Sequence, residues 1–187
     1  MLRVGVFGGS FNPPHVAHVL AASYTLLIAP IDLVCVIPVF QHPFAKELAP
    51  YDARLRMCEL AFEGVARVEV SDVERRLGGE SRTLRTLEHL QEIEPDWSMR
   101  LIIGSDVVAD LPKWHRFDRI AEIAPPFVLE RRGVGTTGKS VLPEVSSSEI
   151  RELARRGEIG ELSLLLPRGV LEHVRQNRLY GCPPSEP

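Results

Sequence analysis

Near its amino terminus the chain runs Gly8-Gly9-Ser10-Phe11-Asn12-Pro13-Pro14-His15-Val16-Ala17-His18, between two apolar segments. The residues before this stretch, Val4 to Phe7, predict a buried strand, and those after it, Val19 to Ile28, predict a helix. A glycine-rich turn between a strand and a helix is where α/β proteins hold phosphate. Because His15 and His18 are three residues apart, both should project from one face of the first helical turn. The stretch therefore predicts an α/β fold with an anion site at its first turn.

Outward from this stretch, apolar runs alternate with helical periods along the chain. The predicted strands are Arg3–Phe7, Asp32–Val39, Val65–Val70, Met99–Ile103 and Pro126–Glu130. The predicted helices are Val16–Ile28, Tyr51–Phe62, Thr83–Ile93, Phe117–Ile123, Ser147–Arg156 and Arg168–Gln176. This alternation is typical of βαβ units around a parallel sheet. The expected fold class is α/β, with a single Rossmann-like domain over residues 1–187, a parallel sheet flanked by helices, and a frayed tail at 182–187.

Length and composition limit the broad class of protein. A chain of 187 residues can bury one sizeable core. The net charge of -3 at pH 7 argues against coating nucleic acid or lying on a membrane surface. The three cysteines lack CxxC spacing and predict neither a disulfide framework nor a zinc site. No secretory signal opens the chain, and Val19 to Ile31 is too short for a membrane helix. A cytoplasmic protein without nucleic-acid or membrane partners is expected.

The residue types of the first stretch suit phosphate binding. Gly8 and Gly9 let a ligand approach the backbone without a Cβ in the way. Ser10 supplies a hydroxyl donor. The imidazoles of His15 and His18 can donate to phosphate oxygens at a helix start, where the helix dipole favours negative charge. A tight turn with surface histidines is the structural alternative, but it leaves this combination unexplained.

The same stretch resembles the GxFxPxHxGH signature of the nucleotidyltransferase superfamily, with Ala17 where the signature usually has glycine. Members of that superfamily transfer a nucleoside monophosphate from a triphosphate. Far along the chain, Val145-Ser146-Ser147-Ser148-Glu149-Ile150-Arg151 resembles their ISSTxIR signature, with Ser148 in place of threonine. Ser146 and Glu149 also form an ordinary helix-capping pattern. The resemblance implies that residues of both stretches hold ATP: Gly8, Gly9, Ser10, Phe11, Ser146, Ser147, Ser148 and Arg151.

Within the superfamily, the chain is most similar to the nicotinate mononucleotide adenylyltransferases. Gly104-Ser105-Asp106, followed by Trp114, resembles their GxD…W segment, in which the tryptophan stacks on a pyridine ring. The resemblance adds Gly104 and Asp106 to the expected ATP contacts. Trp114 could instead cap the core, which is the commoner position of a lone tryptophan. Lys46 lies where these proteins have a PPHK-like sequence, and it is a candidate phosphate ligand.

The segment Ser81-Arg82-Thr83-Leu84-Arg85-Thr86-Leu87 aligns with the family's SYTxDTL segment, which lies against the pyridine nucleotide. Arg82 replaces the tyrosine and Arg85 replaces the aspartate. An arginine here could pair with a carboxylate or phosphate of the acceptor. The alternative is a solvated basic helix face, so the departures leave the acceptor's identity open. The resemblance places the acceptor at Arg82, Thr83 and Trp114.

Together the resemblances imply an enzyme of NAD biosynthesis that transfers AMP from ATP to nicotinate mononucleotide, giving deamido-NAD and pyrophosphate. The acceptor's 5′-phosphate would attack the α-phosphorus in line, with His15 and His18 as the catalytic residues. Mg²⁺ would arrive with ATP and bridge phosphate oxygens, since the sequence shows no dedicated carboxylate cage. The same fold allows other acceptors, namely nicotinamide mononucleotide, phosphopantetheine or flavin mononucleotide, or the transfer of CMP.

A second phosphate-binding pattern lies in the glycine-rich segment 132–142, which is expected to be a loop. Gly133-Val134-Gly135-Thr136-Thr137-Gly138-Lys139-Ser140 fits GxxxxGK[ST], the P-loop pattern. A P-loop opens a long helix, but Pro143 stands where that helix would run, and an interior proline costs about 3 kcal/mol. A P-loop kinase or NTPase is thus an alternative from another class. A non-catalytic nucleotide sensor is a further alternative, although it would not need both histidines.

Overall fold

The strands of the computed structural model, which describes residues 1–42, 47–130 and 142–184, form one parallel sheet. They are β1 (Leu2–Gly9), β2 (Leu33–Pro38), β3 (Val68–Val70), β4 (Trp97–Gly104) and β5 (Pro126–Leu129). The order across the sheet is β3-β2-β1-β4-β5, and every neighbouring pair is parallel. The chain therefore winds in opposite directions from β1, which confirms the α/β class and the Rossmann-like sheet.

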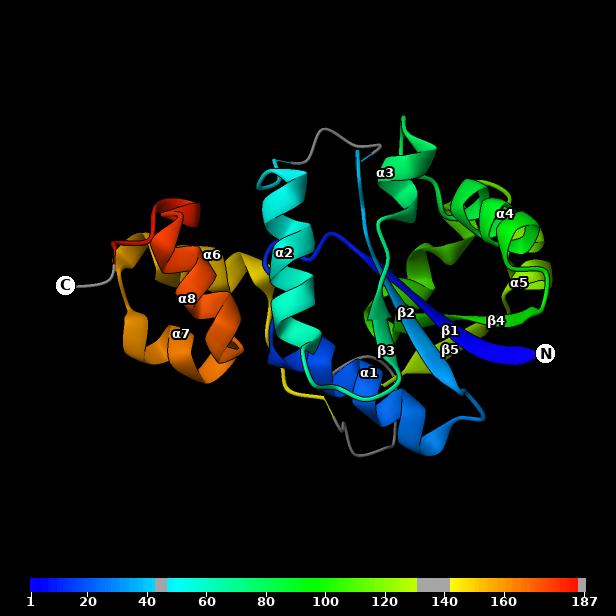
Figure 1. Cartoon of the computed structure of the whole chain (residues 1–187), viewed down its shortest axis with the longest axis horizontal. Helices are drawn as coiled ribbons and strands as arrows, with labels where there is room; N and C mark the ends of the chain where they lie inside the picture. Colours follow the sequence, from blue (N-terminus) through cyan, green and yellow to red (C-terminus); the bar gives the residue numbers. More distant parts are fainter. Residues whose placement is uncertain (43–46, 131–141, 185–187) are drawn as a thin grey trace.

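Helices cover both faces of this sheet (Figure 1). They are α1 (Val16–Ile28), α2 (Tyr51–Phe62), α3 (Val73–Leu77), α4 (Thr83–Ile93), α5 (Phe117–Ile123), α6 (Ser147–Arg156), α7 (Ile159–Leu165) and α8 (Arg168–Gln176), with 3-10 helices η1 (Ser105–Lys113) and η2 (Leu179–Gly181). Side chains alternate between the faces of a strand. In β2, Val34 and Val36 accordingly pack with α1 and α2, whereas Cys35 and Ile37 pack with α3, α4 and α5.

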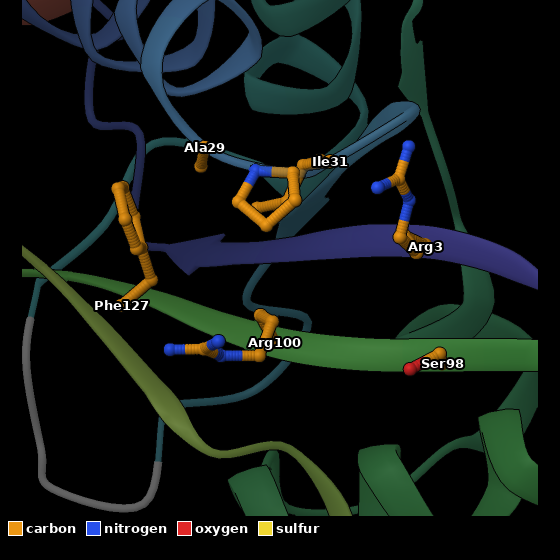
Figure 2. Close-up of a pocket in the computed structure, with 7 residues that line it drawn as sticks. Arg3, Ala29, Ile31, Ser98, Arg100 and Phe127 are labelled. Carbon is orange, nitrogen blue, oxygen red and sulfur yellow. The ribbon is translucent and has the colours of Figure 1, made fainter.

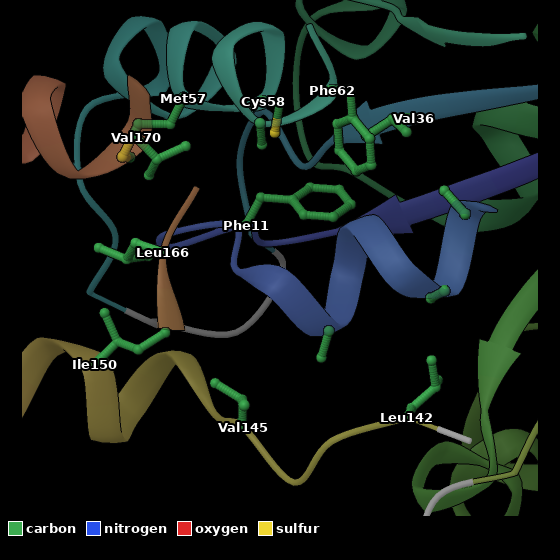
Figure 3. Packing of buried hydrophobic residues seen from close by; sticks show 14 of the residues in the cluster. Phe11, Val36, Met57, Cys58, Phe62, Leu142, Val145, Ile150, Leu166 and Val170 are labelled. Atoms are coloured by element: carbon green, nitrogen blue, oxygen red, sulfur yellow. The ribbon is translucent and has the colours of Figure 1, made fainter. Parts of the chain in front are cut away.

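The three helices α6, α7 and α8 form a group beside α2, at the opposite end of the molecule from the amino terminus (Figure 1). Their apolar side chains join the core of the α1 and α2 face. Figure 3 shows Ile150, Leu166 and Val170 in the same buried cluster as Phe11 and Met57. This packing carries the carboxy-terminal part of the chain to the loop that follows β1.

The helix bounds predicted from the sequence are confirmed for α1, α2, α4, α5, α6 and α8. The helices α3, α7, η1 and η2 were not predicted. The helix α3 has five residues, and η1 and η2 are 3-10 segments without the 3.6-residue period, whereas length does not separate α7 from the equally short α5. The strand ends differ from the prediction by a few residues, because pairing partners and not local pattern decide where a ladder stops.

Two local expectations are wrong. Gly8 and Gly9 do not form the first turn but end β1, where they pair with Ile37 and Pro38 of β2. The turn is made by residues 10–15. The tail does not begin to fray at Cys182, which is buried in the core and donates its N–H to the carbonyl of Leu179 at 3.0 Å. The P-loop-like match lies outside the described residues.

A matched pair of leucines in α7 tests the packing of the carboxy-terminal helices. Leu162 is completely buried and Leu164 is 70% exposed. We expect Leu162→Ala to lower the free energy of unfolding by about 2–5 kcal/mol, because it leaves a cavity. Leu164→Ala should change it by less than about 0.5 kcal/mol. Urea unfolding followed by circular dichroism measures both, and equal losses would contradict the described seating of α7.

Candidate active site

A cavity of about 870 Å³ opens at the carboxyl ends of the central strands. In open α/β sheets ligands bind at this edge, where the winding reverses. Among the sequence-predicted site residues, those that line the cavity are Gly8, Gly9, Ser10, Arg82, Thr83 and Trp114. A Cβ on Gly8 would meet no described atom within 4 Å. The backbone at Gly8 is thus open to a ligand in the cavity.

The two histidines lie together at the start of α1. His15 is the N-cap residue, and the ring centroids of His15 and His18 are 3.8 Å apart. The backbone N–H of His15 donates to Nδ1 of His18 at 3.1 Å. Neutral His18 therefore carries its proton on Nε2, which can donate to an anionic oxygen. His15 is 2% exposed and His18 is half-buried, so His18 is the more accessible of the pair.

Phe11 takes a structural position. Its side chain is 2% exposed and belongs to the core, and its ring centroid lies 4.9 Å from that of His18 in an edge-on arrangement. A Cβ on Gly9 would lie 3.1 Å from Cζ of Phe11. Glycine at this position therefore makes room for the ring, and the ring supports the His18 imidazole. The ATP contact predicted for Phe11 stays a prediction.

The beginning of α6 lies against the turn that leads into α1. The hydroxyl of Ser147 donates to the carbonyl of Pro13 at 3.0 Å, and a guanidinium nitrogen of Arg151 donates to the carbonyl of Asn12 at 3.0 Å. Ser146 caps α6 by accepting from the N–H of Glu149 at 3.1 Å. The structure thus brings together two motifs separated by more than a hundred residues. It also places the amino-terminal ends of two helices, α1 and α6, near each other, an arrangement that favours anions.

Arg151 and Ser147 use hydrogen-bonding groups within the protein. Besides the carbonyl of Asn12, Arg151 donates to the hydroxyl of Ser148 at 3.2 Å. These bonds fasten the turn before α1. The phosphate contacts predicted for the three serines and Arg151 stay predictions.

Two residues that sequence reasoning did not assign to the site hold the same turn from other directions. Arg54 of α2 is 1% exposed and donates to the carbonyls of Ser10 at 3.0 Å and Ala49 at 2.9 Å. Tyr180 donates its hydroxyl to Oδ1 of Asn12 at 3.0 Å, and burial raises the pKa of this phenol. No local sequence pattern marks either residue, because their partners in the turn lie 44 and 168 positions away along the chain.

The two unusual arginines have different surroundings. Arg82 lines the cavity and forms an ion pair with Glu80 at 2.9 Å. Arg85 donates to the carbonyls of Leu77, at 2.9 Å, and of Gly78. It therefore caps the end of α3. Capping α3 is neither of the two interpretations left open by the sequence, an acceptor contact or a solvated helix face, whereas Arg82 lines the cavity and its acceptor contact stays a prediction.

The remaining predicted contacts are less closely grouped. Gly104 ends β4, where it pairs with Leu129 of β5, and Asp106 lies exposed on η1. Lys46 lies outside the described residues.

Over residues 1–42, 47–130 and 142–184, no group of three or more His, Cys, Asp or Glu side chains could hold a metal ion. In the same residues, no helix has the length and apolarity to cross a membrane.

A smaller hollow of about 130 Å³ lies near the opposite ends of the strands (Figure 2). Its lining includes Arg3, Ile31, Ser98, Arg100 and Phe127. Arg3 is bonded to Asp32 at 2.9 Å, and Arg100 donates to the carbonyl of Pro125 at 2.8 Å. Both guanidinium groups are thus engaged within the protein, and the larger cavity is the better candidate site.

Known proteins resemble this chain along nearly its whole length. The model of a family described as cytidylyltransferase-like matches residues 6–153. A probable nicotinate-nucleotide adenylyltransferase of Anaeromyxobacter dehalogenans (strain 2CP-C) is 42% identical over 95% of this chain and 96% of its own length. One from Myxococcus xanthus (strain DK1622) is 41% identical over 96% and 95%. The solved structure of Plasmodium falciparum nicotinic acid mononucleotide adenylyltransferase complexed with NaAD has a TM-score of 0.81, at 17% identity, over 98% of this chain and 99% of that one. At this low sequence identity, the likeness to the Plasmodium falciparum structure shows that the two chains share a fold.

Replacing Tyr180 by Phe tests the link between the carboxy-terminal segment and the turn. We expect the free energy of unfolding to fall by about 1 kcal/mol, because Asn12 loses one donor and keeps the N–H of Ala49 at 3.0 Å. The folded-state pKa of Tyr180 is raised. The difference in unfolding free energy between the wild type and Tyr180→Phe should therefore be constant below about pH 10, the pKa of tyrosine in the unfolded chain. Above that pH the difference should shrink.

Urea unfolding at a series of pH values measures this difference, with Tyr24→Phe, at a half-buried position of α1, as the matched control. A loss of the same size in both variants would mean that the Asn12 contact adds nothing particular to stability.

Proposed function

The chain belongs to the cytidylyltransferase-like family, and we infer from this premise that it catalyses the reaction for which its full-length relatives are named. It transfers AMP from ATP to nicotinate mononucleotide, giving deamido-NAD and pyrophosphate, as an enzyme of NAD biosynthesis. Its substrates are nucleotides. We further propose that it works in the cytoplasm, which three free buried cysteines in the described residues support.

The observation that carries this proposal is that two parts of the candidate site adjoin at the end of β1. On one side lies the cavity, with Arg82, Thr83 and Trp114 in its lining. On the other lie the histidine pair and the amino-terminal ends of α1 and α6. Residues 8–10 join the two, since they line the cavity and lead directly into the turn before α1. An acceptor in the cavity and a triphosphate at the helix ends would meet there.

We propose an in-line transfer without a covalent enzyme intermediate, in which the protein positions the reactants and stabilises charge. Nε2 of His18 donates to a phosphate oxygen. The ring of His15 packs against His18 and holds it in place, and the backbone N–H of His15 fixes the tautomer of His18 by donating to its Nδ1. The dipoles of α1 and α6 stabilise the negative charge that develops on the departing pyrophosphate. ATP enters as its magnesium complex, and Gly104, Asp106 and Lys46 complete the expected ATP contacts.

For the phosphates at the start of α6, we propose contacts with Ser146, Ser147, Ser148 and Arg151. The nearby turn and the capped helix support this placement. A guanidinium carries five N–H groups, and Arg151 uses two of them for the Asn12 carbonyl and the Ser148 hydroxyl, so it keeps these bonds and reaches a phosphate with the other N–H groups.

For the acceptor, we propose that Trp114 stacks on the pyridine ring and that Thr83 and Arg82 bind its substituents. The half-buried indole and its place in the cavity lining support the stacking. Arg82 is half-exposed and paired only with Glu80 among the ion pairs of the described residues. A guanidinium at this wall favours a nicotinate carboxylate over the neutral amide of nicotinamide.

Pyrophosphate release from magnesium-ATP tests the reaction, with nicotinate mononucleotide, nicotinamide mononucleotide, phosphopantetheine or no acceptor added. We expect release that depends on nicotinate mononucleotide. His18→Ala should lower kcat by about 100-fold or more, because it removes a donor to the developing charge, and should leave the circular dichroism spectrum unchanged.

Two controls accompany the His18 variant. His89→Ala changes a histidine of α4 that lies near Glu92, outside the cavity lining, and it should retain wild-type kcat. Lys139→Ala should also be silent, whereas a P-loop enzyme would lose activity. Near-wild-type turnover of His18→Ala would overturn the proposed mechanism.

Arg82→Gln tests selection of the acceptor. We expect kcat/KM for nicotinate mononucleotide to fall about fivefold, which is the effect of a partly exposed ion pair, while kcat/KM for nicotinamide mononucleotide changes less than about twofold. Arg76→Gln, at an exposed position of α3, is the matched control. Equal losses for both acceptors would instead place Arg82 at the ribose phosphate that they share.

A further inference from the structure

Glu74 is a buried carboxylate beside the acceptor cavity that the proposed mechanism does not use. It lies in α3, lines the cavity and is 8% exposed. Its Oε2 accepts from the backbone N–H of Phe40 at 2.9 Å and from the hydroxyl of Ser81. Its Oε1 accepts from the hydroxyl of Thr86 at 3.0 Å. The carboxylate therefore joins α3 to the chain after β2 and to the first turn of α4.

These bonds are part of a larger set around Ser81, which we call the Glu74 network. The hydroxyl oxygen of Ser81 also accepts from the N–H of Phe40 at 2.9 Å and of Gln41 at 3.1 Å. Its backbone N–H donates to the carbonyl of Gln41 at 2.8 Å. Thr86 is 4% exposed. Ser81 and Thr86 thus hold both ends of the segment that carries the proposed acceptor contacts.

The hydrogen bonds to Glu74 come from neutral donors, namely the Phe40 N–H and the Ser81 and Thr86 hydroxyls. Among the described residues, the ion pairs of this region join other groups and leave Glu74 out. A buried carboxylate outside any close ion pair is unfavourable unless hydrogen bonds replace its hydration, and here the more distant Arg54 guanidinium adds some attraction. Conversely, an ionised carboxylate is an acceptor-only group that satisfies all three donors at once. The network is therefore most stable with this segment in one position.

We propose that Glu74 is a positioning residue for the acceptor. Its carboxylate holds the beginning of α4 against the chain after β2, and so determines where Arg82 and Thr83 stand relative to Trp114. It acts through the two hydroxyl groups and the N–H that it binds. The kinetic part of this inference rests on the proposed function. It states that binding of the acceptor depends on Glu74, whereas binding of ATP does not.

Steady-state kinetics of Glu74→Ala and Glu74→Gln test the proposal. In Glu74→Ala we expect KM for nicotinate mononucleotide to rise about tenfold, with kcat and KM for ATP within about twofold of wild type. Glu74→Gln keeps an acceptor oxygen, and the Thr86 hydroxyl can turn to the carbonyl of Arg82, already at 3.3 Å. Its KM should rise no more than about threefold. Glu88→Ala, at an exposed position of α4, should match wild type.

A folded Glu74→Ala protein with an unchanged acceptor KM would overturn the proposal. Equal rises in both KM values would also overturn it, because a general structural defect affects both substrates alike. If Glu74→Ala does not fold, Ser81→Ala combined with Thr86→Val removes two of the donors while keeping the carboxylate. The same separation of the two KM values is then expected.

Amide hydrogen exchange tests the network without any substrate. Glu74→Ala should speed exchange at the amides of Ser81 and Thr86 about tenfold or more, and leave the amides of residues 16–28 in α1 unchanged. Unchanged exchange at Ser81 and Thr86 would refute the positioning role. If the wild-type protein shows normal protection there but no turnover with nicotinate mononucleotide, the proposed function fails while the network stands.

Discussion

The turn between Ser10 and Pro13 is largely buried, and its carbonyl groups must find hydrogen-bond donors inside the protein. The donors come from distant segments: Arg54 of α2, Ser147 and Arg151 of α6, with Tyr180 binding the Asn12 side chain between them. The histidine pair begins at the end of this turn, with His15 as the N-cap of α1. Its geometry therefore depends on the packing of the carboxy-terminal helices beside α2, and on the hydrogen bonds which that packing permits.

The sheet determines where the two substrates can meet. Because the chain passes from β1 to β2 on one side and returns to β4 on the other side of β1, α1 and α2 lie on one face of the sheet and α3, α4 and α5 on the other. The cavity opens on the face of α3, α4 and α5, whereas the histidines belong to the face of α1 and α2. The last residues of β1 and the turn after it touch both sides. This accounts for glycines at positions 8 and 9, one beside the open cavity and the other beside the Phe11 ring.

The parts of the fold that sequence predicts well are those with strong local patterns. Six helices have their predicted bounds, since each carries an apolar face at helical spacing, and α6 adds a serine N-cap and a glycine C-cap. The strand ends are less well predicted. Gly8 and Gly9 suggested a turn, but β2 offers Ile37 and Pro38 as partners and the strand continues. Short helices such as α3 escape detection, although α3 carries the carboxylate of Glu74.

By itself the sequence determined the α/β class, the histidine pair at a helix start, the serine-capped α6 and the family resemblance, because each is written in contiguous residues or a short spacing. Only the tertiary structure decided which polar side chains face the cavity and which hold the protein together. Arg82 and Arg85 look equivalent in sequence, yet one lines the cavity and the other caps α3. The burial and partners of a polar side chain depend on residues far along the chain, and no local pattern encodes them.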